Sequence, residues 1–138
     1  MDFDINRAAR IMRAGNEFSE TNGKLREAVY SFIEWIFQAL DGYDLPGESF
    51  GWIFKKNREN NQYFDVSFKI GGWYSVTTNS KEQRMDGIVL FCRALAGPEG
   101  EILLAWLEKE TKERSHLLVA LQSAIRTFRS SVGGSTSS

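Results

Sequence analysis

The spacing of the apolar residues changes along this chain, and this change constrains the fold more than any other feature. Over residues 22–40 the apolar side chains recur every three or four positions, as in an amphipathic helix. Over residues 50–54 and 64–70 they alternate with other side chains, as in a strand with one buried face. Since the two repeats occupy separate stretches, we expect helices packed on a sheet, which is an α+β fold.

Two helices are predicted before the sheet. Asp4 is a suitable N-cap for a helix over residues 5–14, and Gly15 is a suitable end for it. The second helix covers residues 22–40 and ends before Gly42. Its apolar face is broad, which favours packing under a sheet over packing along one neighbouring helix.

The middle of the chain predicts a three-stranded antiparallel meander. Its strands fall near residues 50–54, 64–70 and 73–78, which are rich in aromatic and β-branched residues. A polar loop over residues 57–61 joins the first two strands, and a pair of glycines turns the chain into the third.

The length of that glycine turn decides which face each residue of the third strand occupies. A two-residue loop would pair Ile70 with Trp73 and place Ser75 on the apolar face. A three-residue loop pairs Ile70 with Tyr74 and keeps the apolar residues of both strands together. We favour the three-residue loop, because a slip of one residue moves every side chain to the other face.

The last third of the chain has two open interpretations. Residues 87–95 and 101–108 are apolar and short, so they fit a second hairpin across a turn that contains Pro98. Alternatively, Pro98 begins a helix. We favour the hairpin, after which Ser115 caps a closing helix. The apolar stripe of this closing helix consists of Leu117, Leu118, Leu121, Ala124, Ile125 and Phe128.

Together these elements predict one α+β domain over residues 1–132 and a flexible Gly/Ser tail over residues 133–138. The predicted architecture is an antiparallel sheet of about three to five strands. Two N-terminal helices and one C-terminal helix are expected on one face of this sheet. The aromatic residues assigned to the core are Phe32, Phe50, Trp52, Phe54, Phe64, Phe68, Phe91 and Phe128.

Charge and composition argue against several classes of function. The chain of 138 residues carries 17 basic and 18 acidic residues, so a broad nucleic-acid-binding surface is disfavoured. The only cysteine, Cys92, lies in an apolar run and is interpreted as a small buried hydrophobic residue. No apolar stretch approaches the length of a membrane-spanning helix, and the N-terminus lacks the pattern of a signal peptide. We therefore expect a cytoplasmic protein that does not bind membranes.

No catalytic or metal-binding motif is recognisable, so the sequence predicts a protein that is not an enzyme and has no cofactor. One histidine and one cysteine far apart in the sequence do not make a zinc site. His116 follows Glu113 closely, but an ordinary surface histidine explains this position without chemistry. Asp65 interrupts a predicted strand, and alternation places it on the outward face, where a charged residue is expected.

The remaining candidate site is a surface that combines aromatic and basic residues on the outward side of the meander. Such combinations occur where proteins bind other proteins, because tryptophan, tyrosine and arginine dominate binding hot spots. They also occur where proteins bind single-stranded nucleic acid. The predicted partner-binding residues are Tyr63, Lys55 and Lys69 on the outward face, Lys56 and Arg58 where the chain enters the loop, and Trp73 at the hairpin tip.

The leading functional hypothesis is a non-catalytic protein-interaction module, such as an adaptor, a chaperone-like subunit or an inhibitor that acts by surface binding. Its partner is another protein or a second copy in a homodimer. One alternative is a small-molecule or enzymatic pocket between the sheet and the second helix, and the other is weak binding of single-stranded nucleic acid through the basic residues. The candidate pocket residues are Tyr30, Trp35, Tyr74, Asp65 and His116.

Overall fold

The computed structural model describes residues 3–40, 47–57 and 62–136, with side chains described as far as residue 132. The chain divides into two compact units, residues 1–100 and residues 101–138. The expectation of a single domain with a Gly/Ser tail stays a prediction.

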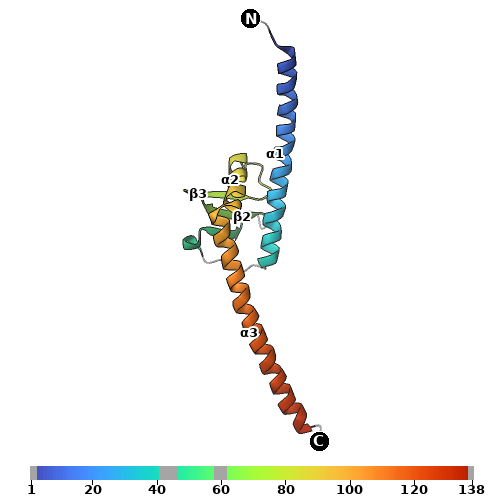
Figure 1. Ribbon diagram of the computed structural model, residues 1–138, viewed down its shortest axis with the longest axis vertical. Coiled ribbons are helices and arrows are strands. Elements are labelled where there is room, and N and C mark those ends of the chain that lie inside the picture. The colour runs from blue at the N-terminus through green and yellow to red at the C-terminus, as the bar shows by residue number, and fades with distance from the viewer. Residues whose placement is uncertain (1–2, 41–46, 58–61, 137–138) are drawn as a thin grey trace. The chain divides into compact units, whose positions relative to one another are not determined.

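A helix comes first, a three-stranded sheet follows, and two more helices complete the described chain (Figure 1). This order confirms the α+β class. The bounds are α1 Ile5–Leu40, the 3₁₀ helix η1 Glu48–Phe50, β1 Trp52–Lys56, β2 Phe64–Lys69, β3 Trp73–Thr77, α2 Met85–Ala96 and α3 Pro98–Thr136.

One long helix, α1, replaces the two helices predicted before the sheet. Asp4 caps it as expected, because the Arg7 backbone N–H donates to the Asp4 carboxylate at 2.9 Å. The predicted end at Gly15 is wrong, and the helix continues through Gly23 as well. A glycine inside a helix lowers the stability of the helix by about 1 kcal/mol relative to alanine but causes no steric clash. The helix can therefore continue through it when the residues on both sides are helical.

The sheet has the predicted strands in the order β1-β2-β3, and both pairs are antiparallel. A three-residue loop joins β2 to β3, but it contains Ile70, so Phe68 rather than Ile70 pairs with Tyr74. The predicted pairing partner was therefore wrong by two residues, whereas the predicted faces were correct. Gly71 takes a φ of +76° in this loop, a conformation that favours glycine.

The core of residues 1–100 lies between the inner face of the sheet, α1 and α2. Phe91 of α2 packs edge-on against Phe68, with ring centroids 5.7 Å apart, and against Trp52 at 6.1 Å. The Trp52 indole N–H donates to the Glu99 carbonyl oxygen at 2.8 Å, so its one polar group is paired. The fully buried core side chains are Ile33, Trp52, Val66, Phe68, Val76, Ile88 and Phe91.

Two helices, α2 and α3, occupy the region where a second hairpin was favoured, so that prediction was wrong. The other interpretation is confirmed, since α3 begins at Pro98. The predicted cap at Ser115 is also wrong, because α3 is already helical there. Short apolar runs fit a buried helix as well as a strand, and the fold decides between them.

Two of the aromatic residues assigned to the core are instead exposed. Phe32 on α1 is 39% exposed and Phe128 on α3 is 68% exposed.

The described helices contain no segment that is both long and apolar enough to cross a membrane.

Candidate functional site

The predicted aromatic and basic residues lie at two ends of the sheet rather than in one patch. At one end, Trp73 is the first residue of β3 and pairs with Lys69, the last residue of β2. Both side chains are exposed, and Trp73 is 43% exposed. A shallow hollow of about 290 Å³ lies beside them, lined by Glu48, Ile53, Ser67, Trp73, Tyr74 and Ser75.

Lys55 occupies the other end of the outer face, directly opposite Asp65. The carboxylate of Asp65 accepts a hydrogen bond from the Thr77 hydroxyl at 2.8 Å and from the Asn57 amide at 3.2 Å. These bonds link β2 to β3 and to the residue that follows β1, which explains Asp65 as a structural residue. Lys55 and Lys69 are about 13 Å apart along the strands, because four residues separate their positions on β2.

The other predicted binding residues do not extend either end into a larger patch. Tyr63 is half-buried just before β2, and its carbonyl oxygen accepts the Asn57 backbone N–H at 2.9 Å. Lys56 is exposed but follows Lys55 in β1, so it lies on the opposite face of the sheet. Arg58 lies outside the described residues.

The candidate pocket residues are not gathered around one cavity. Tyr30 is buried, and its hydroxyl donates to the Ser80 carbonyl oxygen at 3.3 Å. Trp35 is exposed, while Asp65 and Tyr74 alternate onto opposite faces of the sheet. His116 belongs to the other compact unit.

Aromatic rings fill the space between α1 and the sheet where the pocket was predicted. Phe37 stacks on Phe64 with ring centroids 4.3 Å apart and meets Phe54 edge-on at 5.7 Å. Among the described residues, no group of three or more histidine, cysteine or acidic side chains is placed to hold a metal ion. Burial raises the pKa of the Cys92 thiol, which disfavours the reactive thiolate.

Among the described residues, the largest set of exposed apolar side chains lies on α3. Every residue over 111–132 is exposed, although this stretch carries a regular apolar repeat. The side chains of this repeat are 42–68% exposed. They form a continuous row, unlike the single exposed apolar residues that are common on protein surfaces. We call this row the α3 stripe; it consists of Leu117, Leu118, Leu121, Ile125 and Phe128.

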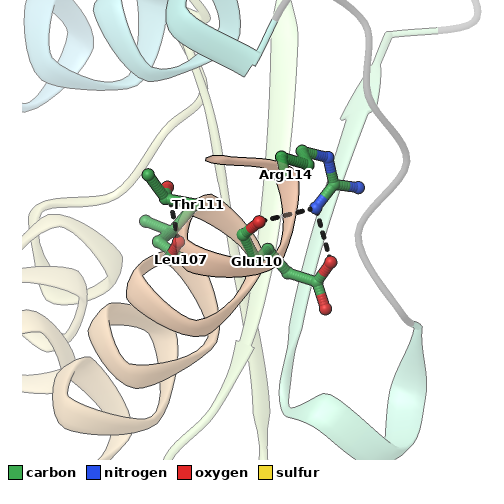
Figure 2. A network of polar contacts seen from close by, with 4 residues as sticks. All are labelled: Leu107, Glu110, Thr111 and Arg114. Atoms are coloured by element: carbon green, nitrogen blue, oxygen red, sulfur yellow. Dashed lines mark hydrogen bonds and ion pairs between the residues drawn. The ribbon is translucent and has the colours of Figure 1, made fainter. Parts of the chain in front are cut away.

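Polar residues interrupt the repeat just before the α3 stripe, and two of them, Thr111 and Arg114, pair with groups one turn back along α3. The Thr111 hydroxyl donates to the Leu107 carbonyl oxygen at 2.8 Å. The Arg114 guanidinium turns back to the Glu110 carbonyl oxygen at 3.2 Å and forms an ion pair with the Glu110 carboxylate (Figure 2). The α3 stripe therefore begins after this polar turn, while Ile102 and Leu104 are exposed before it.

The first half of α1 is a second exposed helical segment with apolar side chains. Over residues 5–21 nearly every side chain is exposed, including Ile11, Met12 and Phe18 at 64–71%. Three arginines at positions 7, 10 and 13 lie among them. This segment extends past the sheet, as the blue end of α1 shows (Figure 1).

Comparisons with protein-family models, with curated proteins and with solved structures found no match to this chain. Sequence reasoning recognised the apolar repeat on α3 but assigned its Phe128 to the core, whereas the structure leaves the repeat exposed. The absence of acidic residues from 115–138 was the available clue, because the outer side of that helix carries few charges to contrast with the repeat.

Proposed function

We propose that this protein is a non-catalytic protein-interaction module that binds a protein partner through the α3 stripe. The observation that carries the proposal is the row of five large apolar side chains, 42–68% exposed, along one side of α3. Removing such side chains from water is favourable at about 25 cal/mol per Å². Exposed apolar rows at helical spacing fit the grooves and helices of partner proteins.

The arrangement of the basic residues favours a protein partner over nucleic acid. Lys55 faces Asp65 across the strands, and Lys69 lies about 13 Å away along β2. A nucleic-acid surface needs several cations that follow one phosphate backbone. On the outer face of the sheet, Trp73 and its hollow form a separate, smaller candidate surface.

The proposal is tested by capture of host proteins with matched variants of the tagged protein. Leu121→Asp with Phe128→Asp places two charges in the α3 stripe. Ser123→Asp with Ser130→Asp places the same charges on the opposite side of the same helix. We expect partner proteins to be retained by the wild type and by the serine-based variant and lost from the stripe variant, as quantified by mass spectrometry.

Circular dichroism checks that both variants keep their helix content, so that a loss of binding is not a loss of structure. Identical profiles for the wild type and the stripe variant, with unchanged self-association, would contradict the proposal. Adding Trp73→Ala and Tyr63→Ala as a third variant tests the outer sheet face. Unchanged capture there would limit binding to the α3 stripe.

A further inference from the structure

Four of the five residues of the α3 stripe have a spacing that is the same in both chain directions. Leu118, Leu121, Ile125 and Phe128 are separated by three, four and three residues. We infer that the stripe is covered by a second copy of this chain, with the two α3 helices packed antiparallel about a two-fold axis. This inference rests on the proposed function, because it names the partner of the same stripe.

The two-fold arrangement places an apolar side chain opposite each of these four residues. Leu118 faces Phe128 of the second copy, and Leu121 faces Ile125 of the second copy. The two-fold axis repeats both pairs with the two copies exchanged. The interface therefore contains four consecutive apolar layers. Alternating spacings of three and four residues are those of a coiled-coil seam, and a two-fold interface uses one surface twice.

The exposed area of the stripe matches what a stable dimer needs. With about 200 Å² taken as the full accessible area of a large apolar residue, the five side chains expose roughly 600 Å² per helix. Two copies together would remove at most about 1,200 Å² of stripe surface from water, which is the lower end of the range of stable protein interfaces. Flanking side chains such as Gln122 and Ala124 add to this area.

The charges of α3 favour the antiparallel arrangement over a parallel one. Arg114 precedes Leu121 by seven residues, so in a parallel pair the two Arg114 side chains would meet in the seam. Arg129 would likewise lie level with its own copy. In the antiparallel pair the two Arg114 positions are about 27 Å apart, and Arg129 lies beside the uncharged Ser115 of the second copy.

Cross-linking between single cysteines tests the direction of the two helices. Each variant carries Cys92→Ala, which removes the native thiol. Ser115→Cys and Arg129→Cys are prepared separately, mixed, and treated with a short bis-maleimide linker. We expect a cross-linked dimer from the mixture and none from either variant alone, because positions 115 and 129 are about 21 Å apart on one helix.

A matched pair on the opposite side of α3 controls for chance encounters. His116→Cys and Ser130→Cys have the same separation of 14 residues and lie away from the stripe. Their mixture should give no cross-linked dimer. Cross-linking by Ser115→Cys alone would show a parallel pair and would overturn the inference.

Light scattering of the purified full chain measures the number of copies. We expect the mass of two chains for the wild type and for Ser123→Asp. Leu121→Asp should raise the dimer dissociation constant by about 100-fold or more, because a charge replaces an apolar partner in two layers. The mass of one chain, or of more than two, for the wild type would overturn the inference.

The same measurements separate a failure of this inference from a failure of the proposed function. A monomer that still captures a host protein through the stripe would leave the proposed function standing with a different partner. A monomer whose melting temperature falls on Leu121→Asp would show that the chain covers its own stripe. If stripe substitutions change neither the mass, the melting temperature nor the capture of host proteins, both the inference and the proposed function are wrong.

Discussion

The second half of α1 and the middle of α3 carry similar apolar repeats but end in different surroundings. Ile33 on α1 is fully buried against the sheet and α2, whereas Ile125 on α3 is 42% exposed. The amphipathic repeat alone indicates only that a helix has an apolar side. What lies opposite that side decides whether it becomes core or binding surface.

The largest effect is expected from the same substitution made in both helices. Ile33→Ala should lower the free energy of unfolding by about 2–5 kcal/mol, because it opens a cavity among buried side chains. Ile125→Ala should cost less than about 1 kcal/mol under monomeric conditions, since its side chain is already in contact with water. Urea titrations followed by circular dichroism give both values.

The cost of Ile125→Ala should depend on protein concentration, while that of Ile33→Ala should not. Stability supplied by a second copy grows with the concentration of that copy. If both substitutions lower the free energy of unfolding equally and independently of protein concentration, the distinction between a core position and a surface position is wrong.

A smaller loss is expected where α2 turns into α3. A Cβ atom on Gly100 would overlap the Leu95 carbonyl oxygen, so the backbone must shift to accept it. Gly100→Ala should therefore destabilise residues 1–100 by about 1–3 kcal/mol. A denaturant titration that shows unchanged stability would mean that this close turn is not needed by the core.

The smallest effect is expected in the exposed first half of α1, and it has the opposite sign. Nothing lies within 4 Å of a Cβ atom added to Gly15, which is helical and exposed. Gly15→Ala should raise helix content and stabilise α1 by about 0.5–1 kcal/mol. Circular dichroism at 222 nm measures the helix content, and a decrease would show that this glycine is needed for a contact.

The strands could be predicted from sequence because their period of two is local. Val66 and Phe68 alternate with polar neighbours, and the structure buries both. The helices were harder, because glycine at position 15 and the apolar run before Pro98 each fit two structures. Choosing between them requires the contacts of the folded chain.

The candidate site shows the same limit. Alternation placed Lys55 and Lys69 on one face correctly, but it could not show that the strand length separates them. Trp73 was expected at the hairpin tip and instead begins β3, paired with Lys69. Likewise, the repeat on α3 was recognised from sequence. Its exposure could not be, since periodicity does not record what covers a helix.

By itself the sequence determined the α+β class, the three strands, the Asp4 cap and which residues share a face, because each depends on neighbours a few positions apart. Only the tertiary structure decided that α1 is one helix, that two helices follow the sheet, and that Phe128 and Ile125 stay exposed. These outcomes depend on contacts between distant residues. Burial is a property of both surfaces that meet, and a local repeat describes only one of them.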